Sequence, residues 1–246
     1  MTAIESVAVV GYQACSEQDT VTPLEVFRAT AMVLAGQIAP WKRADPPARL
    51  DVKLVTLKPG NITMQMGTQV VPDAVLDDGD LFDLLYVPGG MGSGAMSRSE
   101  ALLEAIRRHA AAGKVIASSS SGVGIVFRSG ILGTHPVTCQ SSIARRLSRE
   151  GANVVRPRPM WKGLPDAGIW TTTGSYGVNA STVALVSHYF GREIGTVVSM
   201  MFDTFGGIGK KIFDDVGPES HYHPEVELQF QDYFEPLLLT EPVGYR

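Results

Sequence analysis

A run of four serines and a glycine, Ser118-Ser119-Ser120-Ser121-Gly122, has the residue types and spacing of a nucleophile elbow. Such a turn joins a strand to a helix so sharply that one side chain stands at the edge of the sheet, and the following N–H groups point toward it. An apolar strand pattern precedes the serines, and a helical pattern follows over residues 123–127. The G-x-S-x-G pattern is absent. A hydroxyl-capped connection without chemistry is therefore the alternative interpretation.

Short apolar runs alternate with helical patterns around these serines, which is typical of a largely parallel sheet covered on both faces. We expect strands over residues 7–11, 50–55, 84–87, 114–117 and 152–155, and hairpins over 64–71 and 160–170. We expect helices that begin at Thr22-Pro23 and span 101–112, 141–149, 178–189 and 193–202. Proline suits a first helical turn because its missing N–H needs no partner there.

Ligands of such sheets bind beyond the carboxyl ends of the strands. Three turns at that edge are informative: the loop after the first strand, Pro88-Gly89-Gly90, and the serine turn. We expect these turns to lie together.

Several separated segments match one family in order, and through them the chain resembles the isonitrile hydratase branch of the ThiJ/PfpI superfamily. The matching segments are Asp19 with Pro23-Leu24-Glu25-Val26-Phe27, then Asp83 followed by Val87-Pro88-Gly89-Gly90, the serine turn with Gly130-Ile131-Leu132, and residues 172–179. The resemblance covers roughly residues 5–200. It implies a flavodoxin-like three-layer α/β sandwich. Counting back from Gly130 places Ser120 where the family has its nucleophilic cysteine.

The resemblance also implies roles for individual residues. Asp19 is the acid that faces the nucleophile position, and Ser121 is the neighbouring hydroxyl. The turn that contains Gly89 and Gly90 binds the substrate, and the N–H groups of Gly90 and Ser121 form an anion-stabilising pocket. Similar enzymes add the family thiolate to an isonitrile carbon and hydrate it to an N-substituted formamide. No cofactor or metal is implied.

Departures from the family pattern alter this chemistry. A serine hydroxyl is a poor nucleophile unless an adjacent base takes its proton, and no histidine adjoins Ser120. Ser121 stands where the protease-like branch has histidine, so we disfavour a Ser–His protease. Asn179 replaces an aspartate, and Gln140 replaces the histidine of a T-T-H turn. We therefore interpret Ser120 as an orienting residue and Asp19 as the working group.

Either of the two cysteines could act as the nucleophile instead of Ser120. Cys139 replaces a threonine of the T-T-H turn, and Cys15 lies in the loop after the first strand, which borders the same pocket in this fold. We expect both to be inert buried cysteines, because cysteine is among the most buried residue types. His221 and His223 could form a metal pair, but no third ligand is evident, so we assign no metal site.

Composition excludes several other classes. The formal charge of −4, without a Lys/Arg run, gives no footprint for nucleic acid or an anionic membrane. No apolar stretch approaches the roughly 20 residues that span a bilayer, and the start lacks the basic region of a secretory signal. We expect one cytoplasmic domain over residues 1–246, with a surface insertion at 36–49, a C-terminal extension at 214–246, and the homodimer that the family implies.

Two classes of function remain. The first is a small-molecule enzyme, a hydratase or lyase that acts on a compact electrophile by acid–base catalysis at Asp19. The second is a catalytically inactive homologue that binds or senses a ligand. We favour the enzyme, because the acid and the anion pocket are both retained.

Overall fold

A seven-stranded sheet forms the centre of the computed structural model, which describes residues 4–38, 49–202, 232, 235–236 and 239. Its strand order is β5-β2-β1-β6-β7-β9-β8, and the pairings are parallel except that of β8 with β9. The strands are β1 (Ser6–Val10), β2 (Asp51–Thr56), β5 (Ala74–Val75), β6 (Leu84–Val87), β7 (Val115–Ser119), β8 (Trp161–Leu164) and β9 (Ile169–Thr172), and a separate hairpin holds β3 (Ile62–Thr63) and β4 (Gln69–Val70). The predicted largely parallel sheet is confirmed.

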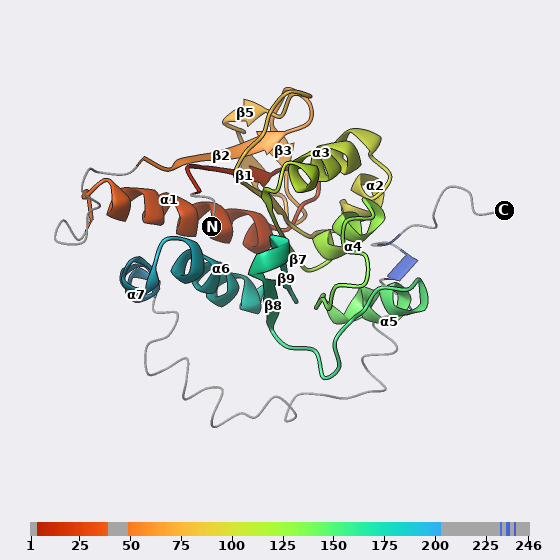
Figure 1. Ribbon diagram of the computed structural model, residues 1–246. Coiled ribbons are helices and arrows are strands. Elements are labelled where there is room, and N and C mark those ends of the chain that lie inside the picture. The colour runs from red at the N-terminus through yellow and green to blue at the C-terminus, as the bar shows by residue number, and fades with distance from the viewer. Residues whose placement is uncertain (1–3, 39–48, 203–231, 233–234, 237–238, 240–246) are drawn as a thin grey trace.

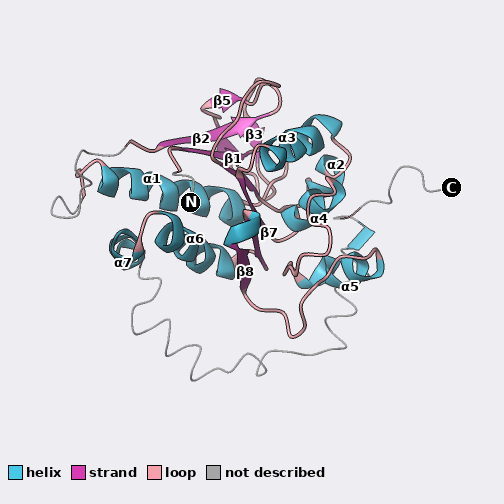
Figure 2. Ribbon diagram, viewed as in Figure 1, coloured by secondary structure: helices cyan, strands magenta, loops and turns pink. Residues whose placement is uncertain are grey.

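Helices cover both faces of this sheet and complete the predicted three-layer sandwich (Figure 1). One face carries α1 (Glu17–Leu34), α6 (Tyr176–Tyr189) and α7 (Arg192–Met201). The other carries α2 (Ser93–Met96), α3 (Glu100–Ala111), α4 (Gly122–Arg128) and α5 (Ser141–Arg149), and a short 3-10 helix, η2 (Pro165–Ala167), joins β8 to β9. The two helical layers flank the strands in Figure 2.

The central strands are mostly apolar and almost fully buried because both faces of the sheet are covered. In β1, Val7 and Val9 pack toward α1 and α6, whereas Ala8 and Val10 pack toward α3 and α4. The four residues of β6 are likewise all buried and alternate between the two layers. These strands therefore hold the carboxyl edge of the sheet rigidly.

Helix α1 begins five residues earlier than expected, so the prediction of a start at Thr22-Pro23 is wrong. The hydroxyl of Ser16 caps the helix by accepting a 3.3 Å hydrogen bond from the N–H of Asp19. Pro23 lies inside the helix. Proline has no N–H to donate to the carbonyl four residues earlier, which is that of Asp19. The early start places Asp19 in the first turn of α1.

Two other local predictions differ from the structure. Residues 152–155 form no strand, and Val154 makes only an isolated bridge with Val137. The short elements β5 and α2 were not predicted, because two or four residues carry too little periodicity. Most of the expected insertion at 36–49 and of the extension at 214–246, with His221 and His223, lies outside the described residues. In the part of the chain that is described, no helix has the length and apolar character needed to cross a membrane.

Candidate functional site

Four connections meet at the carboxyl edge of the sheet, because β1, β6, β7 and β9 are neighbours in the strand order. The segment after β1 contacts the segment after β6: the N–H of Ser16 donates to the carbonyl of Gly89 at 2.8 Å, and Cys15 forms an antiparallel bridge with Gly90. The segment after β7 contacts the end of β9, since the N–H of Ser120 donates to the carbonyl of Thr172 at 2.9 Å. The predicted convergence of the three turns is thus present, with a fourth segment added.

Ser120 has the backbone of a nucleophile elbow. Its φ is +56°, in the left-handed region that costs a residue with a Cβ about 1–2 kcal/mol. Helix α4 begins two residues later at Gly122, where an added Cβ would lie 2.4 Å from the carbonyl oxygen of Val87. The sharp turn predicted from the serine run is therefore present, and the surrounding structure holds it in a strained conformation.

Two glycines from other connections enclose the side chain of Ser120. A Cβ added to Gly89 would lie 2.6 Å from the Cβ of Ser120, and one added to Gly174 would lie 2.5 Å from it. Gly174 also has a φ of +111°, which L side chains rarely adopt. Both positions therefore require glycine, and the space around residue 120 is fixed from two sides.

Asp19 is buried beside Ser120, with 1% of its surface exposed. Its Oδ1 accepts a 2.7 Å hydrogen bond from the N–H of Ser175, and its Oδ2 would lie 2.9 Å from a Cβ added to Gly89. Burial raises the pKa of this carboxyl, while the N–H groups of Ser175 and Gly89 and the hydroxyl of Ser120 act against the rise. Asp19 is thus suited to hold a proton at higher pH than an exposed aspartate.

The hydroxyl of Ser120 contacts Gln140, which the sequence indicated only as the replacement of a family histidine. It donates a hydrogen bond to Oε1 of Gln140, and Nε2 of Gln140 donates to Oγ of Ser142. An amide oxygen is too weak a base to remove the proton of a serine hydroxyl. The described contacts therefore give Ser120 an orienting partner instead of a base.

Ser121 and Gly90 contact each other directly. The N–H of Gly90 donates to Oγ of Ser121 at 3.0 Å, and that hydroxyl donates to the carbonyl of Gly90 at 3.2 Å. The N–H expected to stabilise an anion is thus engaged by a side chain. It can reach an anion only after the Ser121 hydroxyl turns aside, so the anion pocket stays a prediction.

The two thiols are buried. Burial raises the pKa of Cys15, against the hydroxyl of Thr20, which lowers it. Burial also raises the pKa of Cys139 to about 12, although Arg158 and Arg156 lower it, and the guanidinium of Arg158 donates to the carbonyl of Cys139 at 2.8 Å. Because the thiolate is the reactive form, both side chains are poorly placed to act as nucleophiles at neutral pH.

The remaining predicted residue, Asn179, lies half-buried in the first turn of α6. That helix is entered through Ser175, which has a φ of +40° and was not predicted as a site residue. No local signal in the sequence distinguishes Ser175, because its role depends on a contact with α1. His109, by contrast, is structural: Nδ1 contacts the carbonyl of Ala105 at 2.7 Å, and Nε2 accepts from the N–H of Phe82 at 3.1 Å.

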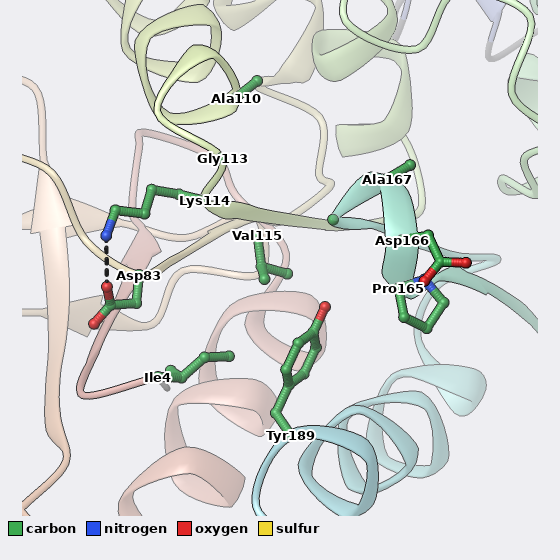
Figure 3. Close-up of a pocket in the computed structure, with 11 residues that line it drawn as sticks. Ile4, Asp83, Ala110, Gly113, Lys114, Val115, Pro165, Asp166, Ala167 and Tyr189 are labelled. Carbon is green, nitrogen blue, oxygen red and sulfur yellow. Dashed lines mark hydrogen bonds and ion pairs between the residues drawn. The ribbon is translucent and has the colours of Figure 1, made fainter. Parts of the chain in front are cut away.

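A cavity of about 320 Å³ lies at the opposite, amino edge of the sheet and contains none of the predicted site residues (Figure 3). Its polar wall includes the ion pair of Lys114 with Asp83, 2.8 Å apart, and the ring of Tyr189 points into it. Asp83 also accepts hydrogen bonds from the N–H groups of Glu5 and Ser6. The aspartate matched to the family motif therefore joins β1 to β6 and is remote from the chemistry.

A second cavity, of about 450 Å³, lies at the carboxyl edge, where it is lined by Tyr12, Leu57, Ile62 and Met96 among others. The hydroxyl of Tyr12 donates to the carbonyl of Pro88 at 2.8 Å, directly before Gly89. Its lining comes from the segments after β1, β2 and β6 and includes polar residues such as Gln13 and Lys58, but neither Ser120 nor Asp19.

Comparisons with known proteins bear on the family and the fold. Residues 5–175 match the DJ-1/PfpI family. The isonitrile hydratase of Pseudomonas putida is 28% identical over 113 residues, which are 46% of this chain and 50% of that protein. The match thus spans half the length of this relative.

Solved structures share the fold at low identity. A THiJ/PfpI family protein from Pseudomonas syringae has a TM-score of 0.75 at 17% identity, over 96% of this chain and 88% of the other. DJ-1beta of Drosophila melanogaster has a TM-score of 0.68 at 19% identity, over 81% of this chain and 97% of the other. Likeness at these identities concerns the fold alone.

Proposed function

Because this chain belongs to the DJ-1/PfpI family, we propose that it is a small-molecule enzyme, similar to isonitrile hydratase, that adds water to a compact electrophile. The observation that carries the proposal is the environment of Asp19. Its buried carboxyl lies against the side chain of Ser120 and is held by the N–H of Ser175. A carboxyl with a raised pKa keeps its proton to higher pH than an ordinary one and can give and take that proton, which acid–base catalysis requires.

An isonitrile, R–N≡C, can be hydrated by one such carboxyl without a covalent intermediate. Protonated Asp19 donates its proton to the terminal carbon, which forms the nitrilium R–N≡CH⁺ and leaves Asp19 ionised. Water then attacks that carbon while Asp19 takes one of its protons. The product R–N=CH–OH rearranges to the formamide R–NH–CHO. One water is consumed, and Asp19 ends protonated as it began.

Ser120 orients the reactants in this scheme and does not attack the carbon. Its hydroxyl is within reach of the Asp19 carboxyl and donates to Gln140, an amide that cannot act as a base. We also expect a cytoplasmic homodimer without nucleic-acid or membrane partners, as the family resemblance and the charge of −4 suggest.

The alternative is a protein that binds or senses such a ligand without turnover. The favouring observation is that the hydroxyl at residue 120 has an amide partner and that the Gly90 N–H is already bonded. A site that has lost its nucleophile and occupies its own anion donor can still recognise a ligand.

Turnover of an isonitrile panel, followed by NMR detection of the formamide, tests the proposal. We expect Asp19→Asn to reduce turnover by about 10²–10⁴-fold while ligand binding persists. Ser120→Ala should lose about tenfold or less, because only orientation is affected. Equal losses in the two variants would contradict a purely orienting role for Ser120.

Binding without turnover by the wild type across the panel would favour the sensing alternative. Ser120→Cys then separates the two cases further. Hydratase activity that appears only in this variant would show that residue 120 occupies a nucleophile site that the native chain does not use.

A further inference from the structure

The hydroxyl of Ser120 has one proton and two neighbouring acceptors. One is Oε1 of Gln140, and the other is the carboxyl of Asp19, whose Oδ2 lies next to the Ser120 side chain beside Gly89. A hydroxyl donates one hydrogen bond and accepts up to two. We propose that Gln140 is a positioning residue whose side-chain amide rotates by half a turn when Asp19 gains or loses its proton. Ser120 then keeps its hydrogen bonds in both protonation states of Asp19. The inference rests on the proposed acid–base role of Asp19 and adds a positioning residue to that site.

One orientation of the Gln140 amide matches a protonated Asp19. Ser120 donates to Gln140, and Gln140 donates onward to Ser142. With its only proton committed to Gln140, Ser120 can meet Asp19 only as an acceptor. The partner that donates must then be the acid O–H of Asp19, and the chain of donors runs from Asp19 to Ser142 without a break.

When Asp19 loses its proton, Ser120 must donate a hydrogen bond to it instead of accepting one. An ionised carboxylate accepts hydrogen bonds only, so the Ser120 proton turns toward it. Oε1 of Gln140 would then face the lone pairs of Ser120, with no proton between the two oxygens. A half-turn of the amide brings Nε2 to Ser120 and Oε1 to Ser142, whose hydroxyl can donate, because amide oxygen and nitrogen exchange places in that turn.

The surroundings restrict this movement to the amide group. Gln140 is the N-cap residue of α5, with an extended backbone, and Ser142 is fully buried in the first turn of that helix. The fixed backbone keeps the amide between the two hydroxyls in either orientation. The neighbouring charge is Arg158, whose guanidinium donates to the carbonyl of Cys139.

The other titratable groups that face Asp19 do not compete for this proton. They are the hydroxyl of Tyr12 after β1, with the thiol of Cys15 beside it, and the hydroxyl of Tyr86 on β6. Burial raises the pKa of each of them, so all three stay neutral while Asp19 titrates. The charge of the site therefore changes at Asp19.

NMR of the ligand-free wild type, labelled with ¹⁵N in glutamine side chains and ¹³C in aspartate carboxyls, tests the inference. We expect the Gln140 amide resonances to shift with pH along the same titration curve as the Asp19 carboxyl carbon. Gln13 is the internal control. Its Nε2 donates to the carbonyl of Asn61 at 3.0 Å and its Oε1 accepts from the N–H of Thr63 at 2.9 Å, so backbone partners lock it.

Two results would overturn the inference. One is a Gln140 amide that stays unchanged while Asp19 titrates, and the other is a Gln140 titration that persists in Asp19→Asn. Gln140→Glu gives a second measurement: an ionised, acceptor-only side chain should move the Asp19 titration to higher pH, and no movement counts against the coupling. These measurements need no substrate, so failure of the proposed hydratase activity leaves them interpretable.

Discussion

The carboxylate of Asp19 accepts a 2.7 Å hydrogen bond from the N–H of Ser175, a residue 156 positions away in the chain. This bond joins the first turn of α1 to the connection between β9 and α6. Ser175 has a φ of +40°, so the backbone is strained where the bond forms. The acid of the site is therefore positioned by a long-range contact.

Asp19→Asn should make the protein more stable at neutral pH. Burial raises the folded-state pKa of Asp19 above the unfolded value of about 3.9, so ionisation of the folded state costs stability as pH rises through that window. Asparagine keeps the acceptor for Ser175 and carries no charge. In denaturant unfolding, the variant should have a larger free energy of unfolding than the wild type above the folded pKa, and this difference should disappear below about pH 3.9. A constant difference at all pH values would contradict this sign.

Gly174→Ala should disrupt the site more than a change in backbone conformation alone does. The new Cβ would lie 2.5 Å from the Cβ of Ser120, and the φ of +111° is unfavourable for alanine, so we expect a loss of about 2–4 kcal/mol in unfolding free energy. Gly130→Ala is the matched control, because its φ is +86° and its Cβ would meet nothing within 4 Å. The control should cost about 1–2 kcal/mol. Equal losses would mean that the contact with Ser120 is easily relieved.

Ser120→Gly should be more stable than Ser120→Ala. Both variants lose the hydroxyl that donates to Gln140, but only glycine relieves the left-handed backbone at a φ of +56°. Relief of about 1–2 kcal/mol, reduced by the greater unfolded-state freedom of glycine, leaves an expected difference of about 0.5–1 kcal/mol. Thermal melts of the two proteins measure it, and a more stable alanine variant would refute the strain.

Asp83→Asn should weaken the fold and leave the chemistry alone. The Asp83 carboxylate accepts from Lys114, Ser6 and Glu5, and these donors hold its pKa below the ordinary value despite the opposing effect of burial. We expect a loss of about 2 kcal/mol at neutral pH, which shrinks as pH falls through the folded pKa and the wild-type carboxylate is protonated.

The control for Asp83→Asn is Asp51→Asn, because Asp51 pairs with Lys53 at 3.0 Å on the surface. Its loss should stay below about 1 kcal/mol. Chemical denaturation measures both variants, and matching losses would show that the additional bonds of Asp83 add nothing.

Cys15 and Cys139 should resist alkylation in the native protein. Burial keeps both thiols protonated, with the pKa of Cys139 at about 12. Mass spectrometry after iodoacetamide treatment near neutral pH should find the native mass unchanged, and both thiols modified once denaturant is added. Rapid native labelling of Cys15 would make it a competing nucleophile.

Local patterns were sufficient to predict the central strands and the elbow, but they missed β5 and predicted a strand at 152–155 that does not form. The buried strands β1, β6 and β7 are nearly continuous apolar runs, and the serine turn follows one of them. The start of α1 was missed because residues 17–20, Glu-Gln-Asp-Thr, show no apolar period, although Ser16 is a normal capping residue. Proline is thus a weaker sign of a helix start here than the serine seven residues earlier.

The contacts that tune the site could not be predicted in this way. Gln140 lies 20 residues from Ser120, and Ser175 lies 156 from Asp19, so each pairing depends on how the strands order themselves. The bond between Gly90 and Ser121 also depends on a side-chain rotamer that no sequence pattern records.

Residue 120 has a left-handed backbone, and glycines from two other connections leave room for its side chain. Serine and cysteine share the same branching and differ by one atom, so either fits between Gly89 and Gly174. A lineage that exchanges one for the other therefore changes its chemistry while its scaffold stays folded.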